Sequence, residues 1–143
     1  MTIDNVYNAK ILEFAGNIPH TERLSAPHGT AKAHSKLCGS TIVVDIAQQD
    51  GRVVEYGQDV KACALGQASA SILAKNALGS SLDDLVTVRD AMKAMLKENG
   101  PAPEGKFSEL KFLEPVKDYK ARHASTMLAF EAAVEAMEEA LNR

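Results

Sequence analysis

The fold is decided by residues 38–63, CGSTIVVDIAQQDGRVVEYGQDVKAC, in which one Asp-Gly pair separates two runs rich in β-branched residues. Asp50 and Gly51 both tolerate the positive φ angles of a tight turn, so the pair predicts a β-hairpin. Folding the chain at this turn brings Cys38 and Cys63, the two cysteines of the chain, to the open end of the hairpin. Cross-strand neighbours lie about 4.5–5.5 Å apart, so we expect the two thiols to converge.

The register of the hairpin follows from which side chains can share a buried face. The strands are expected over 40–47 and 52–60, and a strict two-residue turn would place Ile42 opposite Asp59. A slip of one residue places Ile42 opposite Val60, which is the better apolar match. We therefore expect a bulge or a three-residue loop near the turn.

Apolar residues at helical spacing predict three amphipathic helices outside the hairpin. Glutamates between the apolar residues of the last helix are expected to face water. The apolar stripes are Ile3, Tyr7, Ile11 and Phe14 near the N-terminus, Leu85, Val88, Met92 and Met95 after the hairpin, and Met127, Phe130, Val134, Met137 and Leu141 near the C-terminus.

Two further helix features and a first strand complete the expected fold. The segment 62–77 is rich in Ala, Ser and Gly, so a helix there can pack its backbone closely against a neighbour. Ser81, with Asp84 three residues on, predicts the capping box of the next helix. With a first strand over 30–37, the strands precede most of the helices. This order predicts an α+β fold, a single domain over 1–143 with a small antiparallel three-stranded sheet covered by helices.

Length and charge disfavour several classes of protein. The chain has 143 residues and a net charge of −3, so it offers no basic footprint for nucleic acid. It has no apolar run near the roughly 20 residues that span a bilayer. The sequence does not begin with a basic and then apolar leader, so we expect a cytoplasmic protein whose cysteines stay reduced.

Cys63 is expected where the second hairpin strand passes into a helix. The unpaired N–H groups of a helix start favour a thiolate, the form that binds soft metals or accepts sulfur. Zinc and iron–sulfur centres usually need four ligands, so Cys38 and Cys63 alone make an incomplete metal site. Cysteines can also be inert packing residues, and the spacing alone leaves both interpretations open.

Three motifs occur in order along the chain: Cys38-Gly39-Ser40, Cys63-Ala64 followed by ASAS at 68–71, and Pro115-Val116-Lys117 followed by MLA at 127–129. Together they resemble the NifU/IscU-type iron–sulfur cluster scaffold family, from the first helix to the last. The SufU-like branch is the most similar, because it carries an extra segment before the final helix that 117–122 matches. The resemblance implies a small antiparallel sheet covered by helices, as the residues themselves predict.

The family's site uses three cysteines and one aspartate, which the resemblance carries onto four positions of this chain. The first two cysteines fall on Cys38 and Cys63, the aspartate on Ser40 and the third cysteine on Ser125. Serine is a poor ligand for zinc or iron because its hydroxyl rarely ionises at neutral pH. His123 is the candidate replacement ligand. One helical residue turns a side chain by about 100°, however, so His123 and Ser125 do not share a direction.

A second family motif lies before the last helix. Leu113, Pro115, Val116 and Lys117 resemble the Leu-Pro-Pro-Val-Lys segment by which a dedicated Hsp70-type chaperone recognises IscU-branch scaffolds. Glu114 replaces the first proline and relaxes the extended conformation. The alternative is a proline-bounded loop that no chaperone recognises.

The sequence leaves three functions open. The first, which we favour, is a scaffold-like protein that accepts sulfur from a cysteine desulfurase and binds iron or an iron–sulfur cluster through Cys38 and Cys63. It would act as a monomer, or as a homodimer with four thiolates. The second is a site-degenerate homologue that acts as a binding or regulatory module, and the third is a zinc-binding sulfur acceptor. No phosphate loop, His-Glu-x-x-His motif or nucleophile elbow indicates an enzyme.

Overall fold

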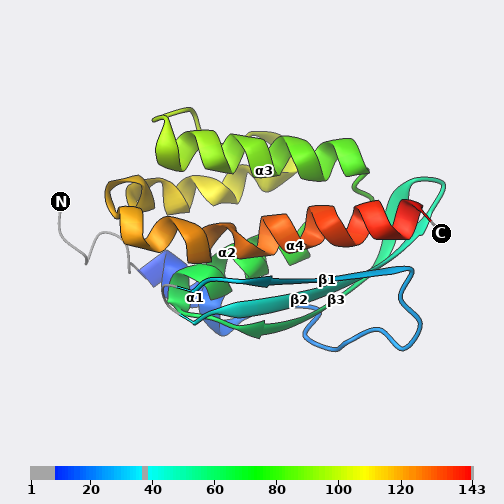
Figure 1. Cartoon of the computed structure of the whole chain (residues 1–143). Coiled ribbons are helices and arrows are strands. Elements are labelled where there is room, and N and C mark those ends of the chain that lie inside the picture. The colour runs from blue at the N-terminus through cyan, green and yellow to red at the C-terminus, as the bar shows by residue number, and fades with distance from the viewer. Residues whose placement is uncertain (1–8, 37–38, 143) are drawn as a thin grey trace.

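The computed structural model describes residues 9–36 and 39–142, and it arranges a sheet and its helices in layers (Figure 1). α4 packs across β1 and β2, α2 packs against α4 and α1, and α3 lies over α4. The predicted α+β fold with a three-stranded antiparallel sheet is therefore confirmed. In chain order the elements are α1 (Ala9–Gly16), β1 (Gly29–His34), β2 (Thr41–Gln49), β3 (Arg52–Lys61), α2 (Ala64–Lys75), α3 (Leu82–Lys97), η2 (Gly105–Asp118), η3 (Lys120–Arg122) and α4 (His123–Leu141).

The hairpin of β2 and β3 has the register that the apolar match predicts. Ile42 pairs with Val60, and the register shifts at a bulge between Ala47 and Gln48. The turn itself stays tight, because Asp50-Gly51 adopts φ angles of 55° and 79°. The bulge thus allows a two-residue turn and apolar cross-strand pairing in the same hairpin.

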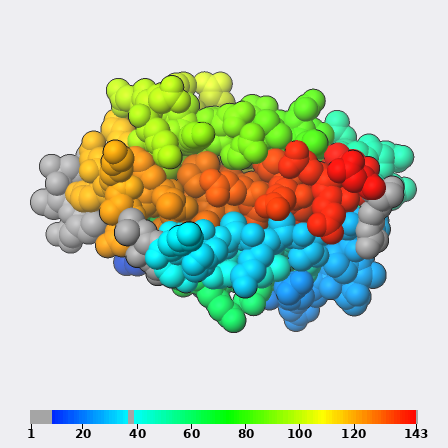
Figure 2. Space-filling view, in the orientation of Figure 1, coloured from blue at the N-terminus to red at the C-terminus, as the bar shows by residue number. Residues whose placement is uncertain are grey.

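The helices follow their predicted signals. The capping box at the start of α3 is complete, because the Asp84 N–H donates to Ser81 Oγ at 3.1 Å and the Ser81 N–H donates to Asp84 Oδ2 at 3.0 Å. The apolar stripe of α3 is buried, as is that of α4 as far as Met137. Figure 2 shows α3, α4 and β1 side by side on one face of the molecule. Among the described residues, no helix is long and apolar enough to cross a membrane.

The apolar stripe of α4 is shorter than the sequence predicts. Leu141 is 39% exposed, whereas Met137 is fully buried. Leu141 follows Met137 by four residues, about 40° more than one helical turn, and it is the last residue of α4. The side chain of Leu141 therefore points in a different direction from that of Met137 and lies outside the core. In the N-terminal helix, Ile11 and Phe14 are buried on α1, and Ile3 and Tyr7 lie outside the described residues.

The segment before α4 is η2, in which two stretches of 3₁₀ helix meet at a kink at Phe107, with φ −100° and ψ 15°. A 3₁₀ helix repeats every three residues, so side chains three apart share one face. Phe107, Leu110, Leu113 and Val116 have this spacing, and all four are buried. The apolar period was therefore present in the sequence, but it was three residues rather than 3.6.

Candidate functional site

Cys63 lies where the sequence predicts, between the end of β3 and the start of α2. It is the N-cap residue of α2, with extended backbone angles of φ −68° and ψ 172°, and its side chain makes no capping hydrogen bond. The thiol is half-buried and is not part of a disulfide. Cys63 therefore presents a free sulfur at the end of the helix where backbone N–H groups are unpaired.

Ser125 is the hydrogen-bond partner of that sulfur. Cys63 Sγ lies 3.3 Å from Ser125 Oγ, and Ser125 is almost fully buried in the first turn of α4. The Ser125 hydroxyl also lies 3.5 Å from the Arg122 carbonyl oxygen, to which it donates. The structure thus brings together two of the four positions that the resemblance implies.

A glycine allows α2 to approach the start of α4. A Cβ atom on Gly66 would lie 3.2 Å from the Ser125 carbonyl oxygen and 2.8 Å from the Ala62 Cβ atom. A side chain at this position would therefore push the two helices apart. The small-residue composition of 62–77, which predicts close packing, is explained by this contact.

Cys38 lies outside the described residues, so its predicted convergence with Cys63 stays a prediction. The chain on either side of it is fixed, because the Ser35 N–H donates to the Ser40 carbonyl oxygen at 2.9 Å and the Gly39 N–H donates to the Ser35 carbonyl oxygen at 2.8 Å. Gly39 has a φ of 71°, in the left-handed region that favours glycine.

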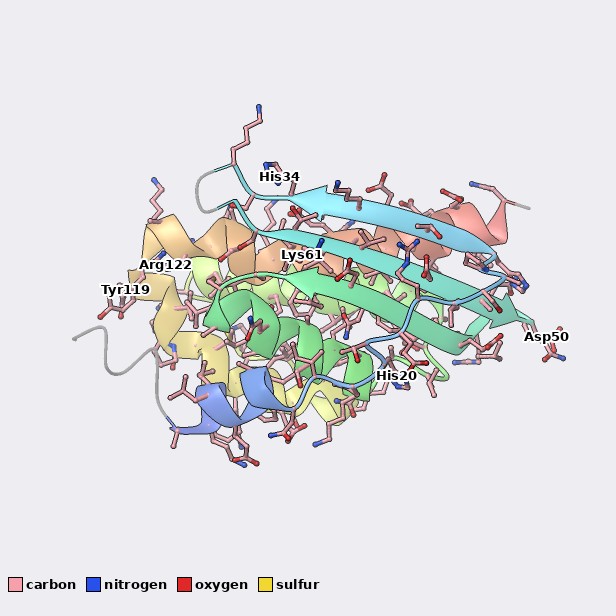
Figure 3. All side chains as sticks on the ribbon, turned by 90° about the horizontal axis from the view of Figure 1, so that it is seen from below. His20, His34, Asp50, Lys61, Tyr119 and Arg122 are labelled. Atoms are coloured by element: carbon pink, nitrogen blue, oxygen red, sulfur yellow. The ribbon has the colours of Figure 1, made fainter. Side chains whose placement is uncertain are left out.

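Ser40, the second substituted position, is buried and directly precedes β2. Thr41 pairs with Lys61, so Ser40 and the α2 start lie at the same end of the hairpin. Lys61 and His34 lie toward this end of the sheet, and Asp50 marks the opposite end (Figure 3).

His123 turns away from Ser125, as the sequence predicts. Its Nε2 atom lies 3.0 Å from the Val116 carbonyl oxygen and 3.1 Å from the Lys117 carbonyl oxygen. Carbonyl oxygens only accept hydrogen bonds, so Nε2 is the donor in these contacts and is engaged by the backbone of η2. Among the residues that the structure describes, no three His, Cys, Asp or Glu side chains form a group that could hold a metal ion.

The chaperone-like motif lies on η2 and is partly inaccessible. Leu113 and Val116 are buried in the core, and Pro115 is half-buried. Lys117 Nζ lies 2.6 Å from Glu114 and 2.9 Å from the Asn99 side-chain oxygen. The hydrogen bond to Glu114 raises the pKa of Lys117. The substitution of glutamate for proline therefore supplies an ion-pair partner as well as a change of backbone.

A cavity of about 680 Å³ beside His123 is a feature that sequence reasoning missed. Lys97, Lys120 and Glu131 are among the residues that line it, and they come from α3, η3 and α4. No local pattern in the sequence brings these three side chains together. The glutamates of α4 are exposed, as predicted, but the surroundings of Glu131 depend on the tertiary fold.

Comparison with known proteins identifies the family. The chain matches the family model of the NifU-like N-terminal domain over residues 6–126. The chain belongs to the NifU-like N-terminal domain family. It is also 24% identical, over 97% of each chain, to the iron–sulfur cluster assembly scaffold protein IscU of Thermotoga maritima. The resemblance to NifU/IscU-type iron–sulfur cluster assembly scaffolds is thus confirmed.

Solved structures agree with this assignment. The crystal structure of a nitrogen-fixing NifU-like protein (N-terminal) from Brucella abortus is 52% identical, with a TM-score of 0.96 over 99% of this chain and 98% of that one. A putative iron–sulfur cluster assembly scaffold protein for the SUF system from Fervidobacterium islandicum has a TM-score of 0.86 at 15% identity, over 95% of this chain and 99% of that one. The second likeness shows a shared fold, so the SufU-like branch stays a prediction. The Cys63–Ser125 contact joins the two positions on which the resemblance puts the family's second and third cysteines.

Proposed function

We propose that this protein is an iron–sulfur cluster assembly scaffold that accepts sulfur and holds iron or a nascent cluster as cargo through Cys38 and Cys63. The observation that carries the proposal is the position of Cys63, a half-buried residue at the start of α2 whose sulfur lies 3.3 Å from Ser125 Oγ. The resemblance puts the family's third cysteine on Ser125, so two side chains from the family's site positions lie in contact here although one of them is altered. Since the thiols need to stay reduced, we place the protein in the cytoplasm.

Sulfur transfer to Cys63 needs no oxidant. A cysteine desulfurase carries the terminal sulfur as a persulfide on its own cysteine. The Cys63 thiolate attacks that terminal sulfur, the sulfur–sulfur bond of the donor breaks, and the donor cysteine leaves as a thiolate. Cys63 then carries the persulfide, and the Ser125 hydroxyl, 3.3 Å from Cys63 Sγ, is its polar neighbour.

The number of thiols determines how cargo is held. Each chain has two cysteines, and iron–sulfur clusters are usually held by four thiolates. The serines at 40 and 125 are weak ligands, and the His123 Nε2 atom already donates to backbone carbonyls. We therefore expect a cluster to be bound by two chains or by one chain with added small thiols.

Anaerobic reconstitution tests the proposal. Wild-type protein incubated with iron, sulfide and a small thiol should develop visible charge-transfer absorption and retain iron after desalting. Cys63→Ser and Cys38→Ser should each abolish the retained iron. Ser71→Ala, a buried position two turns along α2 from Cys63, should keep it. Wild-type protein that retains no iron and no sulfur would contradict the proposal.

A second candidate, the site-degenerate binding module, is favoured by the serines at positions 40 and 125, where the resemblance puts an aspartate and a cysteine. Such a module would bind a cysteine desulfurase yet retain no iron in the same reconstitution. Recognition of 113–117 by an Hsp70-type chaperone is compatible with either function. It requires η2 to open, because Leu113 and Val116 are buried.

A further inference from the structure

The cavity beside His123 is lined by positive side chains from separate elements. Lys97 ends α3, Lys117 belongs to η2 and Lys120 begins η3. His34 reaches the same cavity from the end of β1, and Glu131 is the one carboxylate among the described residues that line it. Figure 2 shows the elements whose residues line the cavity, with the start of α4 between the end of α3 and the end of β1.

The charges of two of these lysines are not neutralised by an ion pair within the described residues. Lys117 is paired with Glu114, whereas Lys97 and Lys120 have no ion-pair partner within the described residues. The chain as a whole carries a net charge of −3, whereas the two unpaired lysines outnumber the one lining carboxylate, Glu131, so the cavity has the opposite sign of charge. Like charges gathered around a concave surface raise the local concentration of a counter-ion.

Size and lining define the ligand that fits. The volume of about 680 Å³ is within the range of cavities that hold small molecules. Leu96, Met127 and Leu128 supply apolar surface beside the lysines. We propose that this cavity binds a small organic polyanion, a molecule with a short carbon body and two or more negative charges from carboxylate or phosphate groups.

The site is distinct from the thiol site in its chemistry. The contacts that it offers are ion pairs and apolar packing, and none of the described residues that line it is a cysteine. A ligand held by these contacts touches neither a metal nor a sulfur atom of the described residues. Because exposed ion pairs are screened by salt, affinity should fall as ionic strength rises.

Calorimetric titration tests the site with two probes, citrate for carboxylates and glycerol 2-phosphate for phosphates, and glycerol serves as the uncharged control. At low ionic strength we expect saturable binding of at least one anion and none of glycerol. The double variant Lys97→Gln/Lys120→Gln should weaken that binding roughly tenfold or more, because each lysine loses a charge-assisted contact. Glu131→Gln should strengthen it, because it removes the carboxylate that repels the ligand.

A matched double variant distinguishes specific binding in the cavity from nonspecific electrostatic attraction of the anion to the protein. Lys93→Gln/Lys32→Gln removes the same total charge from exposed positions that do not line the cavity, and it should bind like wild type. Equal weakening in both double variants, or no binding of either anion to wild type, would overturn the proposal. The titration is repeated with Cys63→Ser, which should bind the anion normally. The outcome is thus independent of whether the protein assembles clusters.

Discussion

The sulfur atom of Cys63 and the hydroxyl oxygen of Ser125 lie 3.3 Å apart, although the two residues are separated by 62 positions in the chain. Cys63 caps the start of α2, and Ser125 lies in the first turn of α4. Two helix starts therefore meet at one thiol. A hydroxyl at this distance can hydrogen-bond to the thiol or to a second sulfur atom bound to Cys63. The same hydroxyl contributes little as a metal ligand.

Ser125→Cys should restore a third thiol beside Cys63 and strengthen cargo binding. The new sulfur would occupy the family's third cysteine position, next to the existing one. We expect more iron and sulfide per chain after anaerobic reconstitution, and roughly tenfold slower loss of iron to a chelator. Ser71→Cys adds a thiol elsewhere on α2 and should leave both quantities unchanged. Equal gains in the two variants would show that the position of the third thiol is irrelevant.

Cys63→Ser should remove function without removing stability. Cys63 is an N-cap without a side-chain cap, and serine is a preferred N-cap residue whose oxygen can accept from a backbone N–H. The free energy of unfolding in urea should therefore be unchanged or higher by up to about 1 kcal/mol. A loss of more than about 1 kcal/mol would identify Cys63 as a packing residue instead.

Gly66→Ala should destabilise the protein and disturb the thiol site together. The added Cβ atom would lie 2.8 Å from that of Ala62 and 3.2 Å from the Ser125 carbonyl oxygen. We expect a cost of about 1–3 kcal/mol in the free energy of unfolding, with reduced iron retention. Gly16→Ala is the matched control, because nothing lies within 4 Å of its added Cβ atom, and it should change neither quantity substantially. Normal stability of Gly66→Ala would mean that α2 and α4 can separate freely.

Asp45 should make the stability of the protein sensitive to acid. Burial by itself would raise the pKa of its carboxyl group, but hydrogen bonds from Arg23, Thr30 and the Leu24 N–H outweigh burial and hold the pKa below its ordinary value. A carboxyl group with a lowered folded-state pKa stabilises the protein above its unfolded pKa of about 3.9. That contribution is lost as pH falls through the folded-state pKa.

Asp45→Asn measures this contribution. Near neutral pH the variant should lose about 2 kcal/mol of unfolding free energy, because a buried amide cannot accept all of these hydrogen bonds. The difference between variant and wild type should shrink below about pH 4, where the wild-type carboxyl group becomes protonated. A difference that stays constant from neutral to acid pH would show that the lost stability does not come from the charge of Asp45.

Much of the fold could be predicted from the sequence because its signals are local. The Asp50-Gly51 turn, the mismatch that requires a bulge and the capping box of Ser81 each involve residues close in the chain, and all were confirmed. The 3₁₀ period of η2 is also local, but a search for helices of 3.6 residues per turn does not detect it. The exposure of Leu141 depends on where α4 leaves the core, which periodicity does not encode.

The site could be predicted only in part, because its contacts join distant segments. Cys63 at a helix start follows from local patterning, whereas its partner Ser125 was reached through the resemblance alone. The hydrogen bonds of His123 to η2 and the lysines of the cavity have no local signal. The partner of Asp45 is equally remote, since Arg23 lies 22 residues earlier in an irregular segment.

Peptide mass mapping shows whether the Cys63 thiol receives sulfur. The protein is incubated with a persulfide-loaded cysteine desulfurase, digested without reductant, and the masses of its cysteine peptides are measured. We expect a Cys63 peptide that is heavier by one sulfur atom, and no such peptide from Cys63→Ser. An unmodified Cys63 peptide, under conditions in which the same desulfurase gives its sulfur to a small thiol, would show that Cys63 is not a sulfur acceptor.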